Sequence, residues 1–487
     1  MIKSLSRNIL YEAILIFLMV IIGYGYFSSE RDPNVNSRLA LVKAFVDEGR
    51  LEIDSYHNTE LYTIDKSYFN GHYYSDKAVG TAALGVLAYY PVRWIYAHEG
   101  WRLTPRLFRE WMTFLVVSLP TAFIAPFLYV LIQQITASPT RSLIITLSIS
   151  LGTPIYKYGT AFYGHTLATV FYFLAFLIWF YARRQRSISL PWAFISAFLL
   201  GCTVLTEFPT VVLVFLISPY ILFTLYQSRQ LSNWKIYVIM AAGFVIPICL
   251  QLSYNYNIFG TPFITGYSHE SLPAFRVAHG TDFMGIGWPD LRVFFYQTFH
   301  PSLGIFWQSP ILFLAIIGWF FMAKKEEYRT EMYWTMGVIA LYILFFSGYF
   351  DWQGGVVFSP RHLIPILPFF ALPLAFTPKR VAIPLLMAGL VSLFQNLLMA
   401  ASGFEGLYEY IHALLDGTYV LANKGMLFYE VCLPNVINGH LMNNRGIQLL
   451  GLQGPLSLLP LLVLEFVLLI VYFKLIQPES KSKERPI

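Results

Sequence analysis

Charged side chains are scarce in this chain. Asp, Glu, Lys and Arg make up 12% of its 487 residues, whereas a soluble domain contains roughly a quarter. Hydrophobic residues reach 56%, and they form many runs long enough to cross a bilayer core of about 30 Å. The composition argues against a soluble fold and predicts an all-α polytopic membrane protein.

Cysteine is also rare, and the three cysteines do not suggest a disulfide framework. Cys202 and Cys249 lie within apolar runs, and Cys432 lies in a loop. The first apolar run follows Lys3 and Arg7, as in a signal peptide, but it is too long and lacks a small-residue cleavage site. We therefore expect an uncleaved signal anchor.

About twelve transmembrane helices are predicted, in a single integral-membrane domain that covers residues 1–475. A short charged cytoplasmic tail follows at 476–487. The spans are expected near residues 9–27, 111–135, 142–159, 164–182, 190–206, 208–226, 236–256, 303–323, 331–349, 363–377, 381–401 and 456–475.

Lysine and arginine cluster in the short connections between alternate spans. These clusters indicate cytoplasmic loops, because short loops rich in Lys and Arg stay inside. Both termini are then cytoplasmic in a multi-pass protein of the cell (inner) membrane. The net charge of +6 does not indicate nucleic-acid binding, since the basic residues do not form one continuous surface. The clusters lie at Arg183–Arg186, Arg229 with Lys235, Lys324–Arg329, Lys379–Arg380 and the tail.

The opposite, periplasmic face carries three long loops, at residues 28–110, 257–302 and 403–455. Residues 79–98 are apolar enough to cross, but a crossing there would place the Arg183–Arg186 cluster outside. We therefore expect 79–98 to form a juxtamembrane helix in the outer interface, within the long first loop.

Carboxylates are concentrated in the first outer loop. Asp32, Asp54 and Asp76 are surrounded by Tyr, His and Asn close to the membrane surface. A carboxylate placed there could act as a general base on a lipid-linked substrate, and paired Asp and His could hold a divalent cation such as Mg²⁺ or Mn²⁺. The alternative is a solvated loop, which is the preferred interpretation for its other acidic residues, Glu30, Asp47, Glu48 and Glu52.

Further candidates lie where spans meet the outer face. His165 begins a span, Glu207 lies between two spans, and Arg361-His362 follows Gly354-Gly355 and Pro360. Arg361 could bind a phosphate bidentately at headgroup depth, or it could be an interfacial anchor. His165 and Glu207 could serve function or structural hydrogen bonds.

The 257–302 loop has His269, Glu270 and His279 at spacings that match no metal motif. A lid or acceptor-binding role and a purely structural role both remain open for it.

The layout resembles that of the integral-membrane glycosyltransferases of the GT-C fold, which include protein O-mannosyltransferases, aminoarabinose transferases and galacturonosyltransferases. The resemblance rests on Asp32 six residues before Arg38, on Gly71-His72-Tyr73-Tyr74-Ser75-Asp76-Lys77, and on Phe358-Ser359-Pro360-Arg361-His362. Two departures are Pro33 in place of a second acidic residue and His165 where many members have a second Asp.

The resemblance implies a polyprenyl-phosphate sugar donor and a glycolipid or cell-envelope glycan acceptor. Asp32 is then the expected base, with Asp54 and Asp76 as rivals. Arg361 or Lys77 is expected to bind the donor phosphate, and Arg38, His165 and His362 are expected to bind substrate. A transporter or lipid flippase is the alternative. Transporters usually bind substrate at mid-membrane through buried charges, which are few here.

Overall fold

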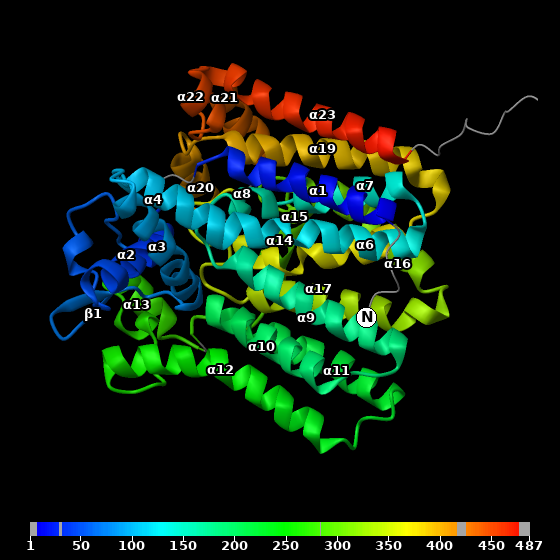
Figure 1. The fold of residues 1–487 in the computed structure, drawn as a ribbon, viewed down its shortest axis with the longest axis horizontal. Helices are drawn as coiled ribbons and strands as arrows, with labels where there is room; N and C mark the ends of the chain where they lie inside the picture. The colour runs from blue at the N-terminus through cyan, green and yellow to red at the C-terminus, as the bar shows by residue number, and fades with distance from the viewer. Residues whose placement is uncertain (1–6, 29–31, 283, 416–424, 477–487) are drawn as a thin grey trace, which may run out of the picture.

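The computed structural model describes residues 7–28, 32–282, 284–415 and 425–476, and it is mostly helical (Figure 1). Within these residues, seven helical segments are long and apolar enough to cross a membrane. They are α1 (Arg7–Tyr26), the segment Pro105–Thr136, α9 (His165–Gln185), Phe208–Gln227, α12 (Trp234–Phe259), Lys379–Ala401 and Gly454–Ile476. This supports a polytopic membrane protein.

Several of these segments contain short turns of a different helical type, marked η. Their parts are α4 (Pro105–Met112), η3 (Thr113–Ser118), α5 (Leu119–Ala122), α6 (Ile124–Thr136), η4 (Phe208–Thr210), α11 (Val211–Gln227), η8 (Lys379–Val381), α19 (Ala382–Ala401), η11 (Gly454–Leu458) and α23 (Leu459–Ile476).

The other five predicted spans correspond to helices that are short, interrupted or, for residues 331–349, not apolar enough, so a count of about twelve is not shown. Residues 142–159 are divided between two helices that end and begin around Gly152 and Pro154, and 363–377 contains Pro365 and Pro368. Proline removes a backbone donor and interrupts regular helix. The elements are α7 (Pro139–Ser150), α8 (Ile155–Gly159), α10 (Leu190–Thr206), α15 (Ile305–Gln308), α16 (Ile311–Met322), η6 (Glu326–Tyr328), α17 (Arg329–Phe346), η7 (Arg361–Phe370) and α18 (Ala371–Ala375).

The three long loops contain short elements of their own. In the first loop, β1 (Ser67–Phe69) and β2 (His72–Tyr74) form an antiparallel hairpin in which Tyr68 pairs with Tyr73. The helical elements are α2 (Pro33–Lys43), η1 (Ala44–Glu48), η2 (Asp54–Tyr56), α3 (Gly80–His98), η5 (Gly266–His269), α13 (Pro273–His279), α14 (Leu291–Thr298), α20 (Leu407–Leu415), η10 (Phe428–Cys432), α21 (Leu433–Ile437) and α22 (Arg445–Leu450).

The α3 helix coincides with the predicted juxtamembrane segment 79–98. It is not one of the seven long apolar helices. One side packs on α2, where Gly85 leaves room for Val42, and the other side exposes Leu87 and Trp94 by 69% and 66%. A helix with one buried side and one exposed apolar side is typical of an interface position.

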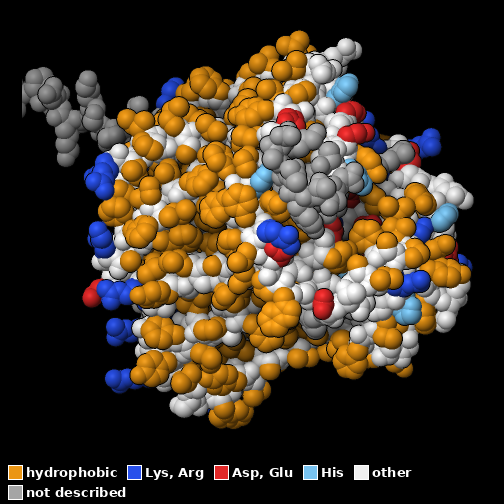
Figure 2. Space-filling model, turned by 180° about the vertical axis from the view of Figure 1, so that it is seen from behind, with side chains coloured by type: hydrophobic (Ala, Val, Ile, Leu, Met, Phe, Trp, Pro, Cys, Tyr) orange, Lys and Arg blue, Asp and Glu red, His pale blue; other side chains and the backbone are white. Residues whose placement is uncertain are grey.

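The basic connections gather at one end of the molecule. The Arg141 side chain binds Thr377, the Arg183 guanidinium donates to the Glu327 carbonyl, and Gln230 binds the backbone of Ile188. These contacts bring the connections α6–α7, α9–α10, α11–α12, α16–α17 and α18–α19 together. Figure 2 shows the resulting row of lysine and arginine side chains, next to a wide hydrophobic band, with acidic and histidine side chains at the far end.

The first and last long helices run antiparallel, so the start of α1 and the end of α23 lie at the same end. The Tyr26 hydroxyl donates to the Ser457 carbonyl, whereas Glu12 is linked through the Tyr129 hydroxyl to Tyr472. The predicted tail beyond Ile476 lies outside the described residues, as do Lys3 and Glu30.

Candidate functional site

A cavity of about 500 Å³ lies among the long loops, where α9 begins, and the basic residues Arg183 and Arg184 lie at the other end of that helix. Five of the predicted site residues line it: Asp32, Lys77, His165, Arg361 and His362. They come from the start of α2, the segment before α3, the start of α9 and the start of η7. The fold therefore brings together side chains that lie up to 330 positions apart in sequence.

Asp32 is the N-cap of α2. Its Oδ1 atom accepts hydrogen bonds from the backbone N–H groups of Asn34 (2.9 Å) and Val35 (3.2 Å), and Pro33 occupies the first helical position. Capping and proline at this position are common ways to start a helix. Both capping hydrogen bonds use one oxygen, so the cap fixes the carboxylate at the cavity wall and explains the Asp-Pro sequence.

Tyr163 is a close neighbour of Asp32 on this side of the cavity. Burial raises the pKa of the Tyr163 hydroxyl, and the Asp32 carboxylate raises it further, while Arg361 acts in the opposite direction. The Arg361 guanidinium lies over the Tyr163 ring, 5.1 Å from its centroid. Tyr163 thus separates the candidate base from the candidate phosphate ligand and contacts both.

Arg361 has no hydrogen bond or ion pair with any residue that the structure describes, and its Nε atom is buried. Gly354 lies against the guanidinium stem, because a Cβ atom there would be 2.8 Å from Nε. The Asp32 and Asp351 carboxylates act on it only through space and make no ion pair with it, and a buried cation without a contacting anion is costly. Arg361 is therefore the group in the cavity best placed to take up an anionic ligand.

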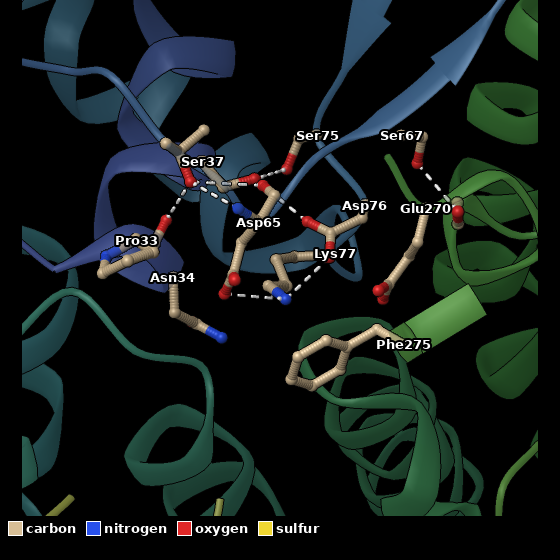
Figure 3. A network of polar contacts seen from close by, with 12 residues as sticks. Pro33, Asn34, Ser37, Asp65, Ser67, Ser75, Asp76, Lys77, Glu270 and Phe275 are labelled. Atoms are coloured by element: carbon tan, nitrogen blue, oxygen red, sulfur yellow. Dashed lines mark hydrogen bonds and ion pairs between the residues drawn. The ribbon is translucent and has the colours of Figure 1, made fainter. Parts of the chain in front are cut away.

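Lys77, in contrast, is already neutralised. Its Nζ atom lies 2.7 Å from Asp76 Oδ2 and 3.1 Å from Asp65 Oδ2, as Figure 3 shows. Burial alone would lower the pKa of Lys77, but the two carboxylates raise it. Asp76 is 1% exposed and accepts a further hydrogen bond from Ser37. Asp76 thus holds Lys77 in place and does not itself line the cavity.

Arg38 lies beneath the cavity and does not line it. Its guanidinium is 1% exposed, binds Asn34, and lies 2.7 Å from Glu207 Oε1. His165 Nδ1 is 3.7 Å from the same oxygen, and the His165 ring meets the His362 ring edge-on at 5.3 Å. These buried groups connect α2, α9 and the break between α10 and α11, so they form the floor of the site.

Asp54 is not brought to this cavity. Its carboxylate accepts from the Tyr73 backbone at 2.7 Å and pairs with His72 Nδ1 at 2.7 Å. Asp54 and His72 line a separate, more open hollow together with Glu52 and Arg50. The three carboxylates proposed from the sequence therefore lie in three different environments.

One wall of the cavity comes partly from the 257–302 loop, for which the sequence left a lid or acceptor-binding role and a structural role open. It is formed by Glu270, His279 and Tyr349, with Asp351 nearby. Burial raises the pKa of Glu270 to about 8 and that of Asp351 to about 6, and it lowers the pKa of His279 to about 4. The local sequence shows only the spacing between Glu270 and His279. It does not show their neighbours in the cavity, Lys77 and Tyr349, because these lie far away in the chain.

The predicted divalent cation finds no ligand set in the part of the chain that the structure describes. No group of three or more His, Cys, Asp or Glu side chains there is arranged to hold a metal ion. Asp65 and Asp76, the paired carboxylates at the cavity, are occupied by the Lys77 ammonium.

Comparisons with known proteins identify no family for the chain. No family model matches it, and no curated protein matches it either. The relation to GT-C enzymes therefore stays a prediction from the motifs, and the function has to be argued from the site itself.

Proposed function

We propose that the chain is a membrane glycosyltransferase that moves a sugar from a polyprenyl-phosphate donor to a glycolipid or glycan of the cell envelope. The observation that carries this proposal is the presence in one cavity of a positioned carboxylate, Asp32, and a guanidinium, Arg361, that forms no ion pair among the described residues. The volume of about 500 Å³ suits a small molecule. A base and a phosphate ligand in one cavity are the two groups that such a transfer requires.

In the proposed reaction, the acceptor hydroxyl oxygen attacks the anomeric carbon of the donor sugar. Asp32 takes the hydroxyl proton as the new carbon–oxygen bond forms. The bond from the anomeric carbon to the phosphate oxygen breaks, and its electron pair leaves with the polyprenyl phosphate. Arg361 stabilises the charge that develops on that phosphate. The products are the glycosylated acceptor, with inverted anomeric configuration, and polyprenyl phosphate.

The neighbouring cations have other roles in this proposal. Lys77 is balanced by Asp65 and Asp76, and Arg38 by Glu207. Neither cation has a charge to spare for a ligand, so Arg361 is the main phosphate ligand. Lys77 acts on the phosphate only through its electrostatic field. His165 and His362 line the floor as substrate contacts, whereas Asp54 has no part in the reaction.

The proposed topology places the cavity on the periplasmic side of the cell membrane and both termini in the cytoplasm. The gathering of basic connections at the opposite end supports it. With the shorter apolar helices also crossing, the chain has about twelve spans. A cavity at headgroup level then meets both a lipid-linked donor and an envelope acceptor.

Binding of a lipid phosphate tests the role of Arg361. The purified protein in nanodiscs should bind polyprenyl phosphate and bind polyprenol, which lacks the phosphate, much more weakly. Arg361→Gln should weaken polyprenyl phosphate binding roughly ten- to hundredfold, as expected for a hydrogen-bonded charge. The control is Arg93→Gln, because Arg93 lies in an outer segment but pairs with Asp47 outside the cavity. Equal binding by both variants would contradict the proposal.

A lipid transporter or flippase is the alternative class. Such a protein would bind the same lipids and move them across proteoliposomes without breaking the sugar–phosphate bond. Translocation of an intact polyprenyl-phosphate sugar, without release of polyprenyl phosphate, would favour it over a transferase.

A further inference from the structure

We propose that Glu270, His279 and Tyr349 form a subsite for the hydroxyl groups of the sugar carried by the donor phosphate. The inference rests on the function proposed above and assigns one wall of that cavity. All three residues line the cavity, and they belong to segments that neither the base nor the phosphate ligand comes from.

The orientation of His279 is fixed on all sides. Its Nδ1 atom lies 3.0 Å from the Phe275 carbonyl oxygen, which can only accept, so Nδ1 carries the proton. Its Nε2 atom therefore accepts from the Tyr349 hydroxyl at 3.2 Å. The Tyr267 ring stacks on the imidazole at 4.5 Å, and Phe350 meets it edge-on at 4.9 Å. A side chain held in this way is preorganised for binding.

Glu270 completes the wall without carrying a full charge. It is 6% exposed, and its Oε1 atom lies 3.4 Å from His279 Nδ1. With a pKa of about 8, Glu270 is mostly protonated near neutral pH, and His279, with a pKa of about 4, is neutral. Figure 3 shows its carboxyl group turned to the same space as the Lys77 ammonium, beside the Phe275 ring.

The chemistry of this wall suits neutral hydroxyl groups. The protonated carboxyl group of Glu270 and the phenol oxygen of Tyr349 offer donors and acceptors to a sugar hydroxyl, while the His279 imidazole, whose two nitrogens are already engaged, holds Tyr349 in position. A second phosphate would find no cation without a carboxylate partner among the described residues of this wall. A polyhydroxylated ring is therefore the chemical class that the wall can satisfy.

The wall also lies next to the phosphate ligand. The Tyr349 ring meets the His362 ring edge-on at 5.2 Å, and His362 directly follows Arg361 in the chain. A sugar joined to a phosphate at Arg361 can therefore reach Tyr349, and beyond it His279 and Glu270. This proximity assigns the wall to the donor sugar.

The test compares lipids with and without the sugar. Wild type and variants in nanodiscs are titrated with polyprenyl phosphate and with polyprenyl-phosphate glucose, mannose, galactose and arabinose. Glu270→Leu, which removes the donor and the acceptor, and His279→Leu, which removes the support of Tyr349, should reduce the affinity for the best-binding sugar lipid roughly ten- to hundredfold, as for one or two lost hydrogen bonds. Their affinity for polyprenyl phosphate itself should stay at the wild-type value.

His72→Leu is the matched control, because His72 also pairs with a carboxylate in the outer loops but lies in the separate hollow. It should leave both affinities unchanged. If the Glu270 and His279 variants lose both lipids equally, or if no sugar lipid binds wild type better than polyprenyl phosphate, the subsite is wrong. Wild-type protein that binds none of these lipids would instead contradict the proposed function.

Discussion

The roles of the cationic residues in and around this cavity depend on whether each one has a carboxylate partner. Lys77 and Arg38 each have carboxylate partners within 3.1 Å, but Arg361 has none among the described residues. Residue type alone could not separate the three. From the sequence, Arg361 and Lys77 were both candidates for the phosphate, and the ion pairs of Lys77 with Asp65 and Asp76, which distinguish them, are seen only in the fold.

The titration of Glu270 gives a prediction about stability. Its pKa rises from the ordinary value of 4.5 to about 8, mainly because it is buried. An acid with a raised pKa favours the folded protein at low pH, and this contribution is lost as pH rises from about 4.5 through about 8. Glu270→Gln, which keeps a neutral side chain, should remove this dependence.

Thermal unfolding at about pH 5 and about pH 9 measures this effect. Between these values the melting temperature of wild type should fall more than that of Glu270→Gln. His279, whose lowered pKa costs stability only as pH falls from 6.5 towards about 4, contributes equally to both proteins. Parallel curves would show that Glu270 titrates normally.

At the scale of elements, the positions of the functional groups follow from helix ends and tight turns. Asp32 caps α2, His165 begins α9 and Arg361 begins η7. These groups could be predicted from sequence, because each lies beside a long apolar run. The breaks within 142–159 and 363–377 could not, because proline also lies inside continuous helices, such as Pro247 in α12, so Pro154, Pro365 and Pro368 do not by themselves mark a break. Glu270 and His279 lie in a loop without any such boundary.

The turn at Gly354 and Gly355 allows a matched test of how Arg361 is held. Both glycines have φ near +86°, where a side chain costs roughly 1–3 kcal/mol. A Cβ atom at Gly354 would lie 2.8 Å from Arg361 Nε, but one at Gly355 would meet nothing within 4 Å. Gly354→Ala should therefore displace the guanidinium and weaken polyprenyl phosphate binding.

Gly355→Ala serves as the control for backbone strain. It should lower the melting temperature about as much as Gly354→Ala and leave lipid binding close to wild type. If both variants lose binding to the same extent, the turn matters through its backbone alone, and contact with Arg361 is not the reason.

At the scale of the whole molecule, charge divides the protein into a basic end and an end with the cavity (Figure 2). The sequence predicted this division because Lys and Arg recur in alternate short connections. It could not predict that Asp54 would lie apart from Asp32, because the hairpin of β1 and β2 turns Asp54 and His72 towards their own hollow.

The topology can be measured with single cysteines in a variant without native cysteine. Asn58→Cys, in the first loop, should react with a membrane-impermeant maleimide in intact cells. Arg186→Cys, in a basic connection, should react only after the membrane is opened. The side chains of Asn58 and Arg186 are both exposed. The access of the maleimide to each cysteine therefore depends only on the side of the membrane on which it lies. The reverse pattern would place the cavity in the cytoplasm.

Turnover of a lipid-linked sugar tests the central claim most directly. Wild-type protein in membranes with envelope lipids should release polyprenyl phosphate from at least one polyprenyl-phosphate hexose or pentose. Asp32→Asn keeps an N-cap acceptor and should remain folded while losing roughly 10²- to 10⁴-fold in rate, as expected for loss of a general base. Full activity in Asp32→Asn, or no turnover of any such donor by wild type, would contradict the account.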